Sequence, residues 1–286
     1  MKKINFTKMQ SLGNDFIIID QIKNAFKINK NNFKINKNNI KKIASRNYGI
    51  GCDQLLILET SNKKNIQFKY KIYNQDGSES GQCGNGAKCV AKYYFDKYGR
   101  SKEEINIETI TNKMSLKIIK RNFYEVDMGK PSFKDTDLKI NTKIFPKNNI
   151  FLFNKKKYLF SWLSIGNPHV IFLIKNIDKI DFLEFSRQFN IKNYFNKGVN
   201  ISIVQKLNGN KYKARIFERG SGETLACGSA ACAITVSMAQ KTKKYNKYYI
   251  YMKGGKAEIK WNGDASKSVY LYGTGDYVYE GEYKIK

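Results

Sequence analysis

The stretch Cys83-Gly84-Asn85-Gly86-Ala87-Lys88-Cys89 has a counterpart in Cys227-Gly228-Ser229-Ala230-Ala231-Cys232, and both place a cysteine on a glycine-containing turn. Apolar residues follow the first turn at helical spacing as far as Gly99, which predicts one helix. The second turn leads into a run that is apolar almost all round and ends in lysines, as in a helix buried inside a domain. The sequence therefore predicts two helices, each with a cysteine at its beginning.

A thiol at the start of a helix faces unpaired backbone N–H groups and the positive end of the helix dipole. Both features are expected to lower the pKa of the thiol, and the same N–H groups can hold a carboxylate. Two such helix ends turned toward each other would present thiols to opposite faces of one small anion. The pattern predicts racemisation or epimerisation, in which a proton leaves one face of a carbon and another arrives on the opposite face.

The bulk properties of the chain fit a globular protein. Its 286 residues suggest about two domains of ordinary size, and 41% hydrophobic residues suffice for cores. Lys2 and Lys3 are followed by a mixed stretch rather than a signal peptide, and no apolar run approaches the ~18 residues of a membrane span. We expect a cytoplasmic protein without a membrane partner.

The cysteine content argues for free thiols. Five cysteines, an odd number in a chain without a secretory signal, do not suggest a disulfide framework. The spacings from Cys83 to Cys89 and from Cys227 to Cys232 do not match a zinc knuckle, and the chain has a single histidine. We therefore expect no metal site.

The net charge of +28 raises the alternative of a nucleic-acid-binding protein, because lysine and arginine neutralise phosphates. The excess is mostly lysine, however, and it accompanies asparagine and isoleucine throughout the chain, which indicates a compositional drift and not a basic stripe. No nucleic-acid-binding motif accompanies it. We expect no nucleic-acid partner; RNA affinity that falls steeply with salt, without turnover, would favour the alternative.

The order of the remaining patterns predicts an α+β fold of two similar halves, each a mainly antiparallel sheet around a central helix. Gly129-Lys130-Pro131 breaks the pattern, so we place one domain at residues 1–128 with 273–286 and the other at 129–272. The last strand is expected to return to the first domain. The expected strands are 4–9, 16–20, 55–58, 68–73, 105–109, 115–119, 123–128, 158–165, 169–173, 200–205, 212–217, 248–252, 256–261, 269–274 and 277–283, with further helices near 40–49 and 181–189.

A tandem copy lies near the N-terminus. Residues 26–32 are repeated without change as residues 33–39. Two units are too few for a coiled coil, so we interpret the repeat as an expanded surface loop without function.

Five ordered blocks give the chain a resemblance to the diaminopimelate epimerase family. The blocks contain both cysteine turns and run in the family's order. They are Gly13-Asn14-Asp15-Phe16; Asn74-Gln75-Asp76-Gly77-Ser78 with Cys83-Gly84-Asn85-Gly86; Gly166-Asn167-Pro168-His169-Val170; Gly198-Val199-Asn200; and Glu218-Arg219-Gly220-Ser221-Gly222-Glu223-Thr224 before Ala226-Cys227-Gly228-Ser229.

The resemblance implies an isomerase that needs no cofactor and converts LL-diaminopimelate to meso-diaminopimelate, in lysine and peptidoglycan biosynthesis. It also implies two similar domains, each a β-barrel-like sheet around a helix, with the site between them. We further expect a homodimer that takes a small-molecule amino-acid substrate.

The resemblance also implies roles for individual residues. Cys83 and Cys227 would be the acid/base pair, and we count His169 and Glu218 with the catalytic residues. The residues that would hold the substrate are Asn14, Gln54, Asn74, Gly84, Asn85, Asn167, Asn200, Glu218, Arg219, Gly228 and Ser229.

The chemistry of the side chains supports some of these roles more strongly than others. Arg219 suits a carboxylate and Glu218 an ammonium, which a substrate with both groups at each end would need. The alternative is a surface ion pair, which the adjoining motif disfavours. His169 is either structural or tunes a cysteine. Proline and hydroxyproline racemases share the logic of paired cysteines, but Glu218 and Arg219 favour a longer substrate.

Three positions depart from the family's usual wording: Cys52, Lys88 and Ala230. Alanine would be strained at a backbone position of positive φ but is favourable in the first turns of a helix, and we expect Ala230 to be helical. Cys52, Cys89 and Cys232 are expected to be buried as small hydrophobic residues.

Overall fold

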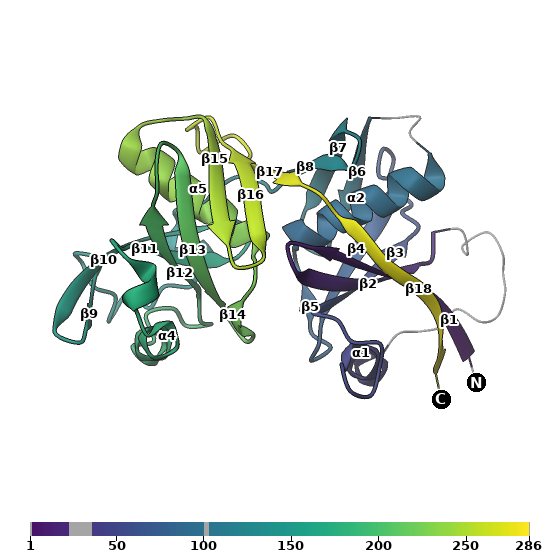
Figure 1. Cartoon of the computed structure of the whole chain (residues 1–286), viewed down its shortest axis with the longest axis horizontal. Coiled ribbons are helices and arrows are strands. Elements are labelled where there is room, and N and C mark those ends of the chain that lie inside the picture. The colour runs from purple at the N-terminus through teal and green to yellow at the C-terminus, as the bar shows by residue number, and fades with distance from the viewer. Residues whose placement is uncertain (1, 23–35, 100–102, 286) are drawn as a thin grey trace. The chain divides into compact units, whose positions relative to one another are not determined.

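The structure is a computed structural model that describes residues 2–22, 36–99 and 103–285 (Figure 1). The chain divides into two compact units, of which unit 1 comprises Met1–Val126 and Gly273–Lys286 and unit 2 comprises Asp127–Tyr272. Each unit combines a mainly antiparallel sheet with one long buried helix. The α+β fold class is therefore confirmed.

Unit 1 contains the N-terminal hairpin and the first cysteine helix. Its helices are α1 (Lys37–Ala44) and α2 (Gly84–Tyr98). Its strands are β1 (Lys2–Ser11), β2 (Asn14–Asp20), β3 (Gln54–Glu59), β4 (Phe68–Asn74), β5 (Glu79–Ser80), β6 (Glu104–Glu108), β7 (Lys113–Lys120), β8 (Phe123–Asp127) and β18 (Asp276–Ile285). The last strand, β18, pairs antiparallel with β1, so the predicted return of the chain end is confirmed.

Unit 2 contains the second cysteine helix. Its helical segments are α3 (Asp135–Leu138), η2 (Ile177–Lys179), α4 (Phe182–Ile191) and α5 (Gly228–Thr242). Its strands are β9 (Ile150–Phe153), β10 (Lys156–Ser164), β11 (Pro168–Leu173), β12 (Asn200–Lys206), β13 (Lys211–Glu218), β14 (Gly222–Thr224), β15 (Lys247–Met252), β16 (Gly255–Lys260) and β17 (Tyr270–Gly273).

The two units share one order of strand pairing. In unit 1, β1/β2 is antiparallel, β2/β3 parallel, β3/β4 antiparallel, β4/β6 parallel, and β6/β7 and β7/β8 antiparallel. In unit 2, β10/β11, β11/β12, β12/β13, β13/β15, β15/β16 and β16/β17 follow the same sequence of orientations. The halves are thus copies in topology, as their sequence patterns predict.

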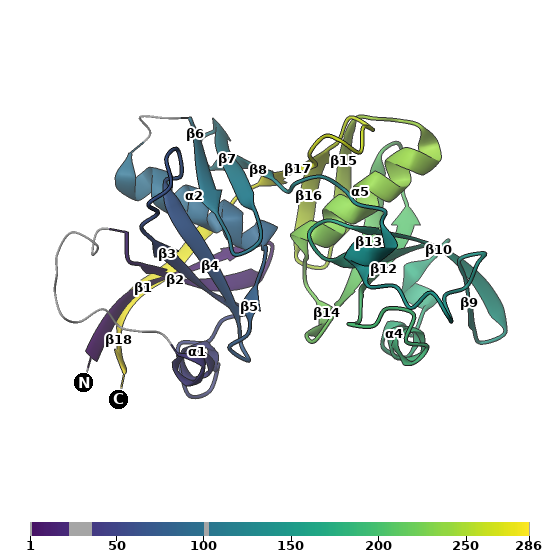
Figure 2. The ribbon, with the colours of Figure 1, turned by 180° about the vertical axis from the view of Figure 1, so that it is seen from behind.

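Each cysteine helix packs inside the sheet of its own unit (Figures 1 and 2). Helix α2 contacts β1, β2 and β7, and α5 contacts β10, β11, β12, β15 and β16. Because these strands are far apart in sheet order, each sheet curves around its helix. Both predicted helices are confirmed, with Cys83 and Cys227 as their N-caps. No helix within residues 2–22, 36–99 and 103–285 is long and apolar enough to span a membrane.

Several elements differ from the sequence expectation. Helix α1 begins at Lys37, because the Asn36 side chain caps it by accepting a hydrogen bond from the Asn39 N–H at 2.9 Å. The end of the tandem copy therefore enters a helix, whereas residues 23–35 lie outside the described residues. The short elements β5, β9, β14 and α3 were not predicted.

Candidate active site

The first cysteine turn places a thiol directly at the N-terminus of α2. Cys83 is partly buried, and its Sγ accepts a hydrogen bond from the Gly86 N–H at 3.3 Å. The Tyr70 hydroxyl donates to the Cys83 carbonyl at 3.3 Å. A Cβ on Gly86 would collide with that hydroxyl, so the turn requires glycine for close packing between β4 and the thiol.

Three predicted binding residues of unit 1 gather at one edge of its sheet. Asn14 begins β2, Gln54 begins β3 and Asn74 ends β4. The register brings them together because Gln54 is opposite both Phe16 and Asn74. The Gln54 Nε2 donates to Asn74 Oδ1 at 2.9 Å, and the Asn74 Nδ2 donates to Ser78 Oγ at 3.0 Å.

Gly84 and Asn85 form the first two positions of α2. Asn85 is only 1% exposed, and neither polar atom of its amide has a hydrogen-bond partner among the residues that the structure describes. Burying an amide without partners is costly. A bound polar molecule at this helix end would supply the missing hydrogen bonds.

The second cysteine turn is linked to the histidine. Cys227 Sγ lies 3.4 Å from Ser229 Oγ, and Ser229 Oγ lies 3.1 Å from His169 Nε2. The same Nε2 lies 2.9 Å from Asn167 Oδ1. Four predicted site residues of unit 2 therefore form one polar chain that ends at the N-terminus of α5, where Gly228 is the first residue.

The protonation of this chain follows from its burial. His169 is fully buried, and burial together with the positive charge of Arg219 lowers the pKa of His169 from 6.5 to about 3. The imidazole is therefore neutral at physiological pH. Since Asn167 Oδ1 can only accept a hydrogen bond, the proton belongs on Nε2, which makes His169 a donor that positions Asn167.

The expectation of a lowered thiol pKa is wrong for Cys227. Its side chain is buried, and burial and the nearby Glu218 carboxylate raise the pKa of Cys227 well above its usual value. Hydrogen bonds from Ser229 and the Ala230 N–H act in the opposite direction. Desolvation of the thiolate outweighs the helix end, so Cys227 holds its proton at neutral pH.

Strand register also positions the remaining residues of unit 2. His169 is opposite Asn200 on the neighbouring parallel strand, and Asn200 Oδ1 accepts from the Arg219 N–H at 2.9 Å. The Arg219 Nη1 donates to the Lys197 carbonyl at 2.9 Å. Thr224, a residue not predicted for the site, donates from Oγ1 to Glu218 Oε1 at 2.7 Å.

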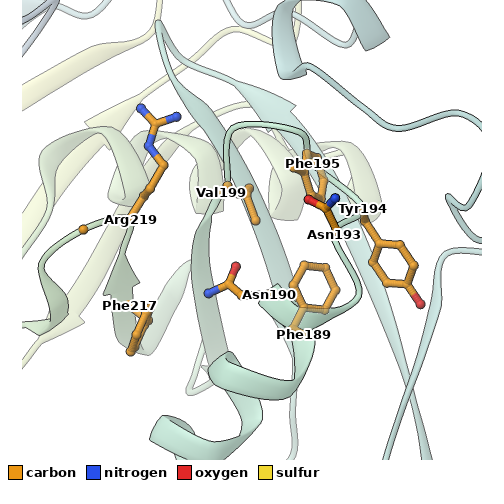
Figure 3. A pocket seen from close by; sticks show the side chains of 10 residues that line it. Phe189, Asn190, Asn193, Tyr194, Phe195, Val199, Phe217 and Arg219 are labelled. Atoms are coloured by element: carbon orange, nitrogen blue, oxygen red, sulfur yellow. The ribbon is translucent and has the colours of Figure 1, made fainter.

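A cavity of about 280 Å³ opens within unit 2 beside Arg219. Figure 3 shows Phe217 near the end of β13 and Arg219 directly after that strand. It also shows Phe189 of α4, and Tyr194 and Phe195 of the loop after α4. The cysteine and histidine of unit 2 do not line this cavity. It adjoins the predicted site through Arg219 alone.

The other cysteines and Ala230 behave as predicted. Cys52, Cys89 and Cys232 are fully buried, and burial raises the pKa of Cys52 to about 12. Ala230 lies in α5, fully buried, in a helical conformation that favours alanine. No disulfide joins any of the five cysteines within the described residues. Within the described ranges, no three His, Cys, Asp or Glu side chains gather in a way that could hold a metal ion.

Solved structures share this fold. A phenazine biosynthesis protein of the PhzF family from Bacillus anthracis matches 100% of both chains, with a TM-score of 0.71 and 17% identity. A hydroxyproline epimerase from Agrobacterium vitis matches 99% of this chain and 91% of its own, with a TM-score of 0.72 and 9% identity. The chain, with its two units of like topology, therefore has the fold that these solved structures share.

Sequence similarity identifies the family. The model of the family described as diaminopimelate epimerase matches residues 6–134 and 161–280. A relative from Blochmanniella floridana, named diaminopimelate epimerase, is 37% identical over 280 residues, which cover 97% of this chain and 99% of the relative. The chain belongs to the diaminopimelate epimerase family.

Proposed function

We propose that this chain epimerises diaminopimelate between its LL and meso forms, with Cys83 and Cys227 as the two acid/base groups and without a cofactor. The observation that carries the proposal is the occurrence of a cysteine N-cap on the central helix of each of two units with the same topology. One unit would serve each face of the α-carbon.

The proposed step moves one proton off the carbon and another onto it. Because burial raises the pKa of Cys227, we assign the donating thiol to Cys227. Proton balance then requires Cys83 to accept the α-proton as a thiolate. Cys83 takes the α-proton as the C–H electron pair stays on carbon. The carbanion then takes the proton of Cys227 on the opposite face, which leaves Cys83 as thiol and Cys227 as thiolate.

Stabilisation of the carbanion is the hard part, since an α-hydrogen is a very weak acid. The N–H groups at the starts of α2 and α5, with Gly84, Asn85, Gly228 and Ser229, would hold the α-carboxylate where negative charge develops. The buried, unpartnered amide of Asn85 supports this assignment, because a carboxylate or ammonium of the substrate would complete its hydrogen bonds.

The orientation of two amides in unit 2 supports a second carboxylate site. Asn167 and Asn200 both engage their carbonyl oxygens, with His169 and with the Arg219 N–H respectively. Their Nδ2 groups therefore face away from those bonds and can donate, as can the Arg219 guanidinium. We assign these donors to the distal carboxylate, and Glu218 to an ammonium group of the substrate.

Proton NMR of LL-diaminopimelate with the reduced protein in heavy water tests the reaction, without added pyridoxal phosphate or metal. Loss of the α-proton signal and appearance of the meso isomer are expected. Cys83→Ala and Cys227→Ala should each lower turnover by at least about 100-fold, because each removes an acid/base group. Cys89→Ala and Cys232→Ala, buried cysteines of the same two helices, are the matched controls and should stay active.

Two outcomes would contradict the proposal. Near-normal turnover by Cys83→Ala or Cys227→Ala would remove that cysteine from the chemistry. Turnover of proline without turnover of diaminopimelate would assign the substrate instead to the racemases of the same fold. A homodimer, a cytoplasmic location and the absence of a nucleic-acid partner stay predictions of the sequence.

A further inference from the structure

A network of charged side chains contacts Asn14 at the edge of the unit 1 sheet. Arg46 binds Asp15 through two hydrogen bonds, of 3.0 Å from Nη1 and 2.8 Å from Nη2. The Arg46 Nη2 also donates to Asp53 Oδ1 at 2.8 Å. The ammonium of Lys8, a buried side chain, lies 2.6 Å from Asp15 Oδ2 and donates to the Gly51 carbonyl.

Hydrogen bonds from backbone N–H groups also join Asp15 and Asp53. The Asp53 N–H donates to the Asp15 carbonyl at 3.0 Å, and the Asp15 N–H donates to Asp53 Oδ2 at 3.1 Å. Burial alone would raise the pKa of Asp15, but hydrogen bonds from Arg46 and Lys8 outweigh it and lower that pKa to about 2. Lys8, Asp15, Arg46 and Asp53 thus form a network of ion pairs and hydrogen bonds, here called the clasp, which joins the starts of β2 and β3.

The clasp fixes the orientation of the Asn14 amide. The Asn14 Nδ2 donates to Asp53 Oδ2 at 2.5 Å. An ionised carboxylate only accepts hydrogen bonds, so the NH₂ half of the planar amide must face Asp53. The carbonyl Oδ1 is then on the opposite edge, turned away from Asp53 and available as an acceptor.

Gln54 next to Asp53 shows the same arrangement. Its Nε2 is engaged with Asn74 Oδ1, and Asn74 in turn donates to Ser78, whose hydroxyl donates to Asp76 Oδ1 at 2.6 Å. The carboxylate at the end of this relay sets the direction of every donor in it. Both Asn14 and Gln54 therefore turn their carbonyl oxygens away from the protein's own acceptors, which suits a ligand that donates hydrogen bonds.

We propose that Asp53, held in place by Arg46 and Asp15, is a positioning residue of the substrate site: it turns the Asn14 amide so that Oδ1 accepts a hydrogen bond from an ammonium group of the substrate. The inference rests on the proposed function for the identity of that substrate. Asp53 itself acts through Asn14.

The variant Asp53→Asn keeps the shape of the side chain but can donate as well as accept, so it no longer dictates which way the Asn14 amide faces. We expect KM for LL-diaminopimelate to rise by about 3- to 10-fold, the equivalent of one weakened hydrogen bond. The effect on kcat should be smaller, because the contact is formed in the bound substrate before the reaction begins.

A double-mutant cycle separates positioning from a general structural role. In an Asn14→Ala background there is no amide to orient, so Asp53→Asn should change KM by less than about 2-fold. Equal increases of KM in both backgrounds would overturn the proposal, and so would an unchanged KM in the Asp53→Asn single variant. If Asp53→Asn fails to fold, the same cycle is run with Arg46→Gln. This variant removes the guanidinium that donates a hydrogen bond to Asp53 Oδ1.

Glu59→Gln provides the matched control. It breaks an ion pair with Lys71 at 2.8 Å at the other end of β3 and should leave KM unchanged in both backgrounds. The experiment also distinguishes failure of the proposed role of Asp53 from failure of the proposed function. A wild-type protein that does not turn over diaminopimelate refutes the function, whereas an active wild type with additive effects refutes only the role of Asp53.

Discussion

Acidification from about pH 7.5 to about pH 5 should destabilise unit 2 by about 2 kcal/mol through His169 alone. The perturbed group is the fully buried imidazole on β11. Its pKa falls from 6.5 to about 3 in the folded protein because of burial and the charge of Arg219. The unfolded chain binds a proton near pH 6.5, while the folded chain does not.

The sign follows from proton uptake. Above the unfolded pKa of 6.5, both states are neutral at this residue and the free energy of unfolding does not depend on it. Between 6.5 and about 3, only the unfolded state gains a proton, so stability falls as the pH falls. At pH 5 the difference from the unfolded pKa is about 1.5 units, and at about 1.36 kcal/mol per unit this amounts to about 2 kcal/mol.

Urea unfolding measures this loss in the relevant unit. Both tryptophans, Trp162 and Trp261, belong to unit 2, so their fluorescence reports on that unit. The variant His169→Gln keeps an N–H that can reach Asn167 but cannot titrate. Between the two pH values the wild type should lose about 1 M more in its urea midpoint than the variant, for an m-value of about 2 kcal/mol per M.

Two results would refute the reasoning. If wild type and His169→Gln lose equal stability on acidification, His169 does not titrate as its burial requires. If acidification stabilises the wild type relative to the variant, His169 is charged in the folded state and the assignment of a neutral donor to Asn167 is wrong.

Two further predictions concern unit 2. Thr224→Val removes the hydroxyl that donates to Glu218 at 2.7 Å while keeping the shape; KM for LL-diaminopimelate should rise by about 3- to 10-fold, and an unchanged KM in steady-state assays would exclude this hydrogen bond from substrate binding. Ala230→Gly should lower the free energy of unfolding by about 1 kcal/mol, because glycine is a poor helix former; equal or greater stability in the urea assay would show that the position disfavours a helical alanine.

The sequence was most informative where local rules decide the structure. A glycine-containing turn followed by a helical apolar pattern placed α2 and α5 correctly, with Cys83 and Cys227 at their caps. The order of strands was also predictable, because alternation and turn residues are local signals. Helix α1 begins earlier than we expected. Its capping residue, Asn36, lies in an asparagine-rich stretch, so the sequence does not distinguish the capping asparagine from its neighbours.

The remaining features depend on contacts between distant residues. Asn14 and Asp53 are 39 positions apart, and no local pattern gives the direction of an amide. Asp15 lies inside a block that was recognised, and Asp53 directly precedes Gln54, so the charged neighbours of predicted binding residues were the available signal. The raised pKa of Cys227 was not predictable either, because the helix end is visible in the sequence but the burial that outweighs it is not.

The two units show how a repeated fold can serve an asymmetric reaction. The backbone gives each unit a central helix with a cysteine at its N-cap position, whereas the side chains at the strand ends of the two units differ. In unit 2, burial and the Glu218 carboxylate raise the pKa of Cys227, and Asn167 and Asn200 engage their carbonyl oxygens. In unit 1, Asp53 turns the amide of Asn14 the other way. Since inversion at carbon needs one donor and one acceptor of protons at any moment, divergence of the strand ends would provide the difference that a cysteine at both N-cap positions does not provide.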